Sequence, residues 1–449
     1  MLVFIFVIFI GLVFLFVGLF FQSAKYEKKY DRALKSFKAE EYKEALELFQ
    51  ELLGKETTNK LYSWYIGQCY EYLKNYELAI VEYNKVALST RFPHPLNEAE
   101  IHEKLATVNL KIGNIKKAYQ EFQIVVSLSP TNSEAFYYLG ILTKNNGELQ
   151  KGIEYFEKAF RASDNFPEAY LEYGKLNYQL KHIDKAKRSL MRAIEQNPDL
   201  PEAHYYYALI LEKDRIYQKS IKEFRHALED EKLRFDIYVH LGNIYTVLSE
   251  KAEGFNFFEK ALAMTDIKGE GLIEAKYQYA DHLVQAGDLN KAMMLWNEIK
   301  SERPQYKDIE NKLQIYGEIS KSENLTRFIT ALKHDFLSTG AELCKLLKVK
   351  VERYNFKRDD FLEFIGISRS KGTDFACILH LVRWTNTVGE IPVRELLDRM
   401  VEEGAAKGIF VTASSFSEKA QDLAKIRPLL LLERDRLETM LSKVYAESS

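Results

Sequence analysis

The sequence predicts a mainly α-helical chain with an N-terminal transmembrane helix, an α-solenoid and a smaller C-terminal α/β domain. Three observations lead to this prediction: an uncharged apolar run at the start, a helical pattern that recurs every 34 residues, and a change after Pro304 to alternating strands and helices. We expect the transmembrane helix at 1–22, the solenoid at 23–310 and the α/β domain at 320–449.

The composition agrees with several packed modules. A chain of 449 residues is too long for one hydrophobic core, and 28 Tyr and 28 Phe with only 9 Pro favour packed helices. The net charge of −2 gives no global argument for nucleic-acid binding. Cys69, Cys344 and Cys377 lie far apart without a Cys-x-x-Cys pair, which argues against a disulfide scaffold and a zinc ribbon.

The apolar run from Leu2 to Phe21 has the length of a membrane span, since about 20 residues at 1.5 Å each cross the ~30 Å hydrocarbon core. A cleaved signal peptide is the alternative, but no basic residue precedes the run and Gln22-Ser23-Ala24 is a poor cleavage site. The positive-inside rule places the body of the protein in the cytoplasm, because basic residues follow the run and none precedes it. These residues are Lys25, Lys28, Lys29, Arg32, Lys35 and Lys38.

The repeat consists of a small residue, an alanine or glycine twelve positions later and an aromatic residue four positions after that. Gly140, Gly152 and Phe156 show this pattern most clearly. About eight units begin near positions 26, 60, 99, 133, 167, 201, 235 and 273. We interpret each unit as an antiparallel helix pair, in which the small residue lets the two helices approach and the aromatic residue fills the core.

These positions resemble the tetratricopeptide repeat, which implies a superhelix with a groove that binds protein partners. Only Asn243 stands at a position typical of repeats that clamp a terminal carboxylate. The groove instead presents aromatic and mixed-charge side chains, with tyrosines as anchors for a helix or an extended segment. The alternative, that these tyrosines pack within the superhelix, stays open. The groove residues that we predict are Tyr137, Tyr138, Leu171, Glu172, Lys175, Tyr205, Tyr206 and Leu209.

The pattern in the last third of the sequence predicts a β-sheet with helices between some of its strands. Strands are expected at 348–354, 361–367, 375–384, 408–412 and 429–432, with a turn at 369–374, and helices at about 325–347, 393–403, 417–425 and 435–444.

The stretch from Val393 to Ala420, with Gly408-Ile409-Phe410-Val411-Thr412 inside it, and the ending Leu429 to Leu437 resemble the Mrr-type domain of type IV restriction endonucleases. This resemblance implies the PD-(D/E)xK nuclease fold. In that fold an Asp on one strand and Glu or Gln on the next bind Mg²⁺, and a Lys assists the attacking water.

The sequence departs from the family at this site. Glu363 stands where the family has Asp, and His380-Leu381-Val382-Arg383-Trp384 corresponds to Gln-Cys-Lys-Arg-Trp, so that Val382 replaces the catalytic Lys. We predict that Glu363, His380 and Val382 lie on one face of two adjacent strands. We also predict a catalytically degenerate site without metal. Two alternatives remain: Lys371 as a migrated lysine, and Glu363 with His380 as a pair for a softer metal.

The charge of the α/β domain is balanced, with 21 Lys plus Arg and 19 Asp plus Glu over 320–449. A local basic cluster is interrupted by acidic residues, which is typical of a solvated surface and makes DNA a less favoured partner. The cluster comprises Lys348, Lys350, Arg353, Lys357, Arg358, Arg369 and Lys371.

Together these features predict a scaffold anchored once in a bacterial inner membrane, with its body in the cytoplasm. Its repeats bind protein partners and the α/β domain provides a second docking surface. A periplasmic body that assembles onto a membrane machine is an alternative orientation. The alternative function is a membrane-tethered type IV restriction endonuclease, or a DNA-binding protein, that the repeats regulate. No cofactor is expected, except Mg²⁺ if the nuclease site is active.

Overall fold

The structure is a computed structural model that divides into two compact units between Glu231 and Lys232. It describes residues 25–89, 92, 96–370, 373–426 and 429–446. The predicted transmembrane run from Leu2 to Phe21 lies outside these residues. Within the described part of the chain, no helix is both long enough and apolar enough to cross a bilayer.

The first unit is built from antiparallel helix pairs. Residues 25–38 are helical. The helices that follow are α2 (Tyr42–Leu53), α3 (Lys60–Tyr72), α4 (Tyr76–Ala87), α5 (Glu98–Lys111), α6 (Ile115–Leu128), α7 (Ser133–Asn145), α8 (Leu149–Ala162), α9 (Pro167–Gln179), α10 (Ile183–Gln196), α11 (Pro201–Lys213) and α12 (Tyr217–Ala227). Helices α3, α5, α7, α9 and α11 begin within one residue of the predicted unit starts. Their starts have local causes, because an Asn side chain caps α3, α5 and α7 and a proline occupies the first turn of α9 and α11.

Small residues allow the two helices of a pair to approach closely. A Cβ atom added at Gly67 would lie 2.7 Å from the ring of Tyr83, and one at Gly140 would lie 2.6 Å from the ring of Phe156. Both rings are fully buried. The small and aromatic positions of the repeat are therefore core positions, as predicted.

The second unit begins with the helices α13 (Arg234–Val247), α14 (Lys251–Leu262), α15 (Glu270–Ala286), α16 (Leu289–Glu302), α17 (Ile309–Ile319) and α18 (Glu323–Thr330). We expected the 34-residue register to fade after Pro304, and α17 and α18 follow there as two shorter helices. The single helix expected at 325–347 is wrong. Ala331 and Leu332 are extended, and a separate helix, α19 (Lys333–Leu346), begins after them.

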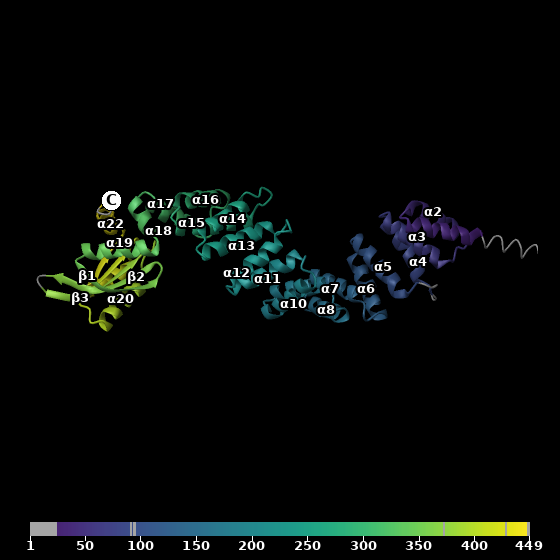
Figure 1. Cartoon of the computed structure of the whole chain (residues 1–449), viewed down its shortest axis with the longest axis horizontal. Helices are drawn as coiled ribbons and strands as arrows, with labels where there is room; N and C mark the ends of the chain where they lie inside the picture. The colour runs from purple at the N-terminus through teal and green to yellow at the C-terminus, as the bar shows by residue number, and fades with distance from the viewer. Residues whose placement is uncertain (1–24, 90–91, 93–95, 371–372, 427–428, 447–449) are drawn as a thin grey trace, which may run out of the picture. The chain divides into compact units, whose positions relative to one another are not determined.

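A five-stranded sheet follows, in the spatial order β1 (Val349–Arg358), β2 (Phe361–Ser370), β3 (Thr373–Val382), β4 (Lys407–Thr412) and β5 (Leu429–Leu432). Strands β1 to β3 are antiparallel, whereas β3, β4 and β5 are parallel. The helices α19 and α22 (Arg434–Ala446) cover one face, and α20 (Glu390–Glu402) and α21 (Glu418–Ile426) pack on the other (Figure 1). This is the α/β arrangement that the sequence predicts.

Helix α18 belongs to the core of the α/β domain as well as to the helix pairs. Its buried residues Leu325 and Phe328 share one apolar cluster with Phe336 of α19, Leu437 of α22 and the inner residues of the sheet. The cluster also includes Ile319 at the end of α17. The last helix pair and the sheet therefore share one hydrophobic core.

Candidate functional site

The strand register brings the predicted site residues together. Glu363 on β2 pairs directly with His380 on β3, and Phe361 pairs with Val382. Because side chains alternate along a strand, Glu363, His380 and Val382 lie on the same face, beneath α20. The predicted pairing is confirmed.

Four side chains form an ionic cluster around a buried carboxylate, which we call the Glu363 cluster: Lys357, Glu363, His380 and Arg399. His380 donates a hydrogen bond from Nε2 to Oε2 of Glu363 at 3.0 Å. Arg399 on α20 donates from Nε to Oε2 at 3.2 Å and from Nη2 to Oε1 at 3.3 Å. Lys357 on β1 places its Nζ 3.3 Å from Oε1. Both oxygens of Glu363 therefore already have two partners each.

The cluster keeps Glu363 ionised. Burial alone would raise the pKa of Glu363, whose side chain is 1% exposed, but the hydrogen bonds from His380 and Arg399 outweigh burial and lower this pKa to about 2. Burial lowers the pKa of His380 despite its carboxylate partner. The neutral ring carries its proton on Nε2, and its buried Nδ1 has no hydrogen-bond partner among the described residues.

This donor set does not suit Mg²⁺. A magnesium ion needs carboxylate oxygens that are free to bind it and usually keeps several waters. The oxygens of Glu363 are occupied, and nowhere in the described ranges do three His, Cys, Asp or Glu side chains stand close enough to hold a metal. Val382 is fully buried among Phe361, Val393 and Phe410 and offers no group to a water or a phosphate.

Lys371, the lysine that the sequence analysis considered as a replacement, lies outside the described residues. Another lysine, Lys357, reaches Glu363 from β1.

The Glu363 cluster lines a cleft of about 570 Å³, which we call the sheet cleft. Phe361 and Trp384 form its aromatic part, with ring centroids 5.7 Å apart. Two acidic residues of α20, Glu395 and Asp398, also line the cleft. The cleft offers apolar and charged contacts but no open pair of strand carboxylates.

The pKa of Glu363 gives a prediction for acid stability. Because this pKa is lower in the folded chain than the ordinary value of 4.5, the stabilisation is fully present above pH 4.5 and is lost as the pH falls towards 2. The difference corresponds to about 3 kcal/mol. We expect Glu363→Gln to lower hydrogen-exchange protection of β2 and β3 by this amount at pH 7, and the gap between variant and wild type to close below pH 4.5. A gap that does not change with pH would contradict this account.

In the first unit, the predicted groove residues differ in burial. Leu171 is buried in an apolar cluster with Leu190 and Tyr207. Glu172 is buried and accepts hydrogen bonds from Lys144 and Lys175, which outweigh burial and lower its pKa. The half-buried members are Tyr137, Tyr138, Lys175, Tyr205, Tyr206 and Leu209.

Half-buried tyrosines of this set pack part of their rings against other aromatic side chains of the repeats. The ring of Tyr138 stacks on Phe122 at 5.0 Å, and that of Tyr205 lies 6.0 Å from Phe224. Tyr206 lies 5.7 Å from Tyr178, and the Nζ of Lys175 is 5.8 Å from the ring of Tyr206. Their partial exposure leaves area for a partner, so packing and recognition are compatible at these positions.

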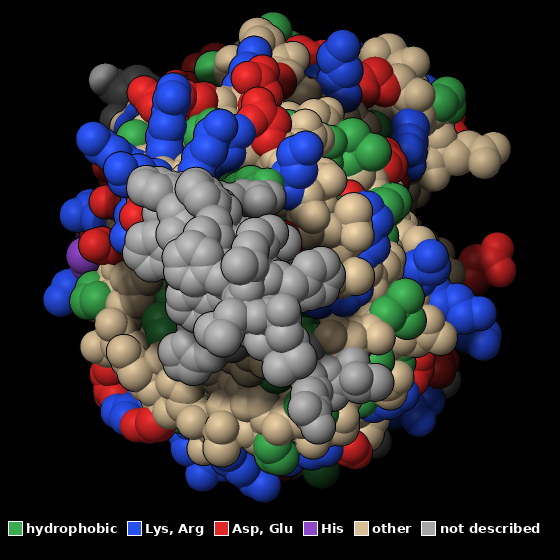
Figure 2. Space-filling view, turned by 90° about the vertical axis from the view of Figure 1, so that its right-hand side faces the viewer, with side chains coloured by type: hydrophobic (Ala, Val, Ile, Leu, Met, Phe, Trp, Pro, Cys, Tyr) green, Lys and Arg blue, Asp and Glu red, His purple; other side chains and the backbone are tan. Residues whose placement is uncertain are grey.

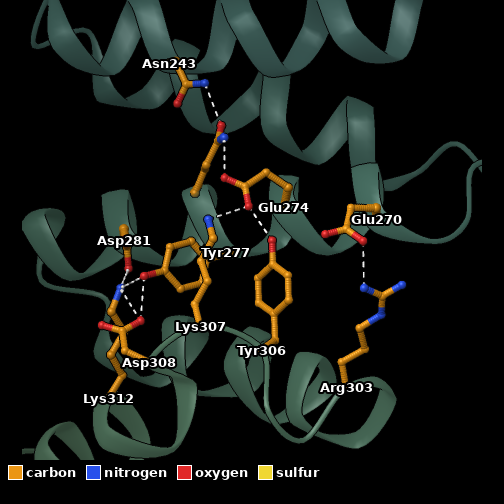
Figure 3. A network of polar contacts seen from close by, with 11 residues as sticks. Asn243, Glu270, Glu274, Tyr277, Asp281, Arg303, Tyr306, Lys307, Asp308 and Lys312 are labelled. Atoms are coloured by element: carbon orange, nitrogen blue, oxygen red, sulfur yellow. Dashed lines mark hydrogen bonds and ion pairs between the residues drawn. The ribbon is translucent and has the colours of Figure 1, made fainter.

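Asn243, the one residue at a clamp-type position, takes part in an internal polar network (Figure 3). Its Nδ2 donates to Oε1 of Gln278 at 2.8 Å, and its Oδ1 accepts from His282. Gln278 donates to Glu274, which also accepts hydrogen bonds from Tyr306 and Lys307 (Figure 3). The amide of Asn243 is therefore engaged between α13 and α15, and the network continues to the segment before α17.

Two families match parts of the chain. The Mrr-type restriction endonuclease family matches residues 330–441, and tetratricopeptide-repeat families match residues 27–94 and 145–210. The chain therefore carries tetratricopeptide repeats and a C-terminal restriction-endonuclease domain. No curated protein matches the chain.

Solved structures of repeat proteins are also similar to it. A crystal structure of MamA is 26% identical, covers 37% of this chain and 95% of its own, and has a TM-score of 0.33. The C-terminal part of a repeat protein from Cytophaga hutchinsonii is 20% identical, with coverages of 63% and 99% and a TM-score of 0.40. YrrB, described as a repeat protein with an unusual peptide-binding site, is 20% identical, with coverages of 39% and 88% and a TM-score of 0.34.

Lys357 and Arg399 are the site residues that the sequence analysis missed. The register of the hairpin formed by β1 and β2 could have identified Lys357. Asn355 on β1 pairs with Glu363, and Lys357 lies only two positions after Asn355 on the same strand. No sequence spacing points to Arg399, which lies 36 positions after Glu363 and meets it only because α20 folds back over the sheet.

Proposed function

We propose that this protein is a membrane-anchored scaffold. Its repeats bind protein partners, and its nuclease-fold domain serves as a second docking surface rather than as a nuclease. One observation supports the second part most strongly: Glu363, which stands where the family binds its metal, already has its carboxylate neutralised by Arg399 and Lys357 and hydrogen-bonded by His380. Because protein cations already compensate the charge of this carboxylate, no metal ion is required to neutralise it.

The proposed mechanism of the repeats is recognition by half-buried aromatic side chains. Tyr205 and Tyr206 are suited to this, because each ring is held by a neighbour and loses little conformational freedom when a partner packs on it. The carboxylate of Glu172 is already paired with two lysines. Recognition at this point of the groove would therefore depend on aromatic area more than on charge.

Tyr205→Ala with Tyr206→Ala is expected to abolish partner capture by the solubilised full-length protein, since aromatic anchors each contribute about 2 kcal/mol or more. The circular-dichroism signal of the helices should stay unchanged. Partner capture is measured by affinity purification and quantitative mass spectrometry. The matched control is Tyr119→Ala with Tyr155→Ala, a tyrosine pair on α6 and α8. A lost helical signal in the Tyr205 and Tyr206 variant would instead assign these rings to the core.

Membrane anchoring through residues 2–21, with the body in the cytoplasm, is part of the proposal. Basic side chains at the start of the described chain support this orientation. Lys25, Lys28, Lys35 and Lys38 are exposed and have no ion-pair partner among the described residues, whereas Lys29 pairs with Glu51. Figure 2 shows Lys and Arg side chains on several sides of the face at this end, with acidic side chains among them.

A phosphatase that is active only in the periplasm, fused after Ser449, tests the orientation. We expect an inactive fusion. An active fusion would favour the periplasmic alternative, in which the repeats assemble onto a membrane machine.

A membrane-tethered restriction endonuclease, or a DNA-binding protein regulated by the repeats, is the second candidate. The family match over 330–441 favours it, together with the placement of a lysine, Lys357, at the site carboxylate. This function would require Mg²⁺, whereas the scaffold requires no cofactor. A Mg²⁺-dependent DNA-cleavage assay separates the two.

A further inference from the structure

The second unit contains a larger cleft of about 1600 Å³, which lies between the turn from α13 to α14 and the α/β domain. We call it the junction groove. Val247, Glu250 and Glu253 line it from the helix pairs, and Leu332 and Trp384 line it from the α/β domain. It shares Arg358, Trp384 and Pro392 with the sheet cleft. The two clefts therefore lie next to each other.

Large apolar side chains are exposed in the junction groove. Val247 is 57% exposed and Leu332 is 67% exposed, and both are lining residues. Trp384 is half-buried beside them. Exposed apolar residues that line one cleft, in contrast to those scattered over a surface, are typical of an interaction site.

Among the described residues, eight carboxylates and six cationic side chains line the two clefts together, which leaves an acidic excess. Basic residues of the junction groove are already engaged: Lys333 pairs with Asp359 at 3.2 Å, Arg358 pairs with Asp360 at 3.3 Å, and Lys251 donates to the carbonyl of Gln285. Four carboxylates have no ion-pair partner among the residues that the structure describes. Two are in the junction groove and two in the sheet cleft: Glu250, Glu253, Glu395 and Asp398.

Arg383 stabilises the wall of the groove. Its guanidinium donates to the backbone carbonyls of Ile329, Ala331 and Asp359. These bonds hold the link between α18 and α19, which carries Leu332, against the turn between β1 and β2. The apolar and acidic side chains of the groove are thus presented by a preformed frame, which reduces the entropic cost of binding.

We infer that the junction groove binds a short segment of a partner protein, in which apolar residues are flanked by lysines or arginines. The apolar part of the segment packs on Val247, Leu332 and Trp384. Its basic side chains pair with the unpartnered carboxylates on either side. This inference rests on the proposed scaffold function, because it locates the second docking surface and states the chemistry of its partner.

Two synthetic peptides test the inference. Both have the centre Leu-Trp-Leu, which is flanked in one peptide by two lysines on each side and in the other by two glutamates. Binding to the full-length protein in nonionic detergent is measured by fluorescence anisotropy. We expect the basic peptide to bind and the acidic peptide not to bind, with affinity that falls as salt is raised. Equal binding of the two peptides, or no binding of either, would overturn the inference.

Charge-reversal variants locate the site. Glu250→Lys with Glu253→Lys is expected to weaken binding of the basic peptide at least tenfold. The control, Glu352→Lys with Glu418→Lys, makes the same charge change at exposed positions that do not line the groove and should bind normally. An equal loss of peptide binding in both double variants, or no loss in the first, would rule out the junction groove as the binding site. The proposed scaffold function is judged separately, by whether partner capture depends on Tyr205 and Tyr206.

Discussion

Val382→Lys should destabilise the α/β domain by several kcal/mol and should not produce DNA cleavage. Val382 is fully buried in the apolar cluster of Phe361, Phe410 and Val393. The ammonium group of a lysine would enter this cluster close to a carboxylate, Glu363, that already has two cationic partners. An unpaired buried charge carries a large desolvation cost. Urea denaturation followed by hydrogen exchange of β3 measures the effect, and a plasmid-nicking assay with Mg²⁺ measures activity.

Val401→Lys is the matched control for this substitution. Val401 lies on α20 but is largely exposed, so the same change should alter stability by less than about 0.5 kcal/mol. A folded and soluble Val382→Lys variant that nicks DNA would show that the site is an open nuclease cleft with one residue missing. That outcome would overturn the scaffold proposal for this domain.

Arg383→Ala should destabilise the second unit by about 3 kcal/mol or more. The substitution removes hydrogen bonds from a charged group to three backbone carbonyls, and such bonds contribute about 1.5–3 kcal/mol each before relaxation. It also removes the packing of the guanidinium on Phe336, 4.4 Å from the ring centroid. Two of the carbonyls lie at the C-terminal end of α18, where no later residue of the helix can satisfy them.

Loss of hydrogen-exchange protection should therefore appear in α18 as well as in β3, because both belong to one core. The control is Arg369→Ala, which removes an exposed guanidinium paired only with Asp374 among the described residues. This surface pair contributes little, so protection should stay within about 0.5 kcal/mol of the wild type. Protection of α18 that is unaffected by Arg383→Ala would contradict the shared core.

The repeats could be predicted closely because their signals are local. The spacing of small and aromatic residues reports directly on helix packing, so Gly67 and Gly140 identify their partners Tyr83 and Phe156 in the printed sequence. The strands of the α/β domain follow from alternation and from the turn at 369–374, and the pairing of Glu363 with His380 follows from that turn. These features need no knowledge of distant contacts.

The remaining features depend on contacts between distant residues. Helix α18 is only eight residues long and packs on α22 and the sheet, so it lacks the repeat signature that would have revealed it. The break at Ala331 and Leu332 contains neither glycine nor proline. Arg383, which directly follows β3, holds it from more than fifty positions away. Arg399 likewise reaches Glu363 only in the folded chain. Sequence periodicity carries no information on such ion pairs.

We propose that the Glu363 cluster is an ionic cluster that stabilises the fold and not a metal-dependent nuclease site. The most direct test of this central claim is cleavage of methylated and unmethylated DNA by the full-length protein with Mg²⁺, compared with Glu363→Gln. The account predicts no cleavage by the wild type above the level of the variant, on either DNA. Mg²⁺-dependent cleavage by the wild type that Glu363→Gln abolishes would contradict it.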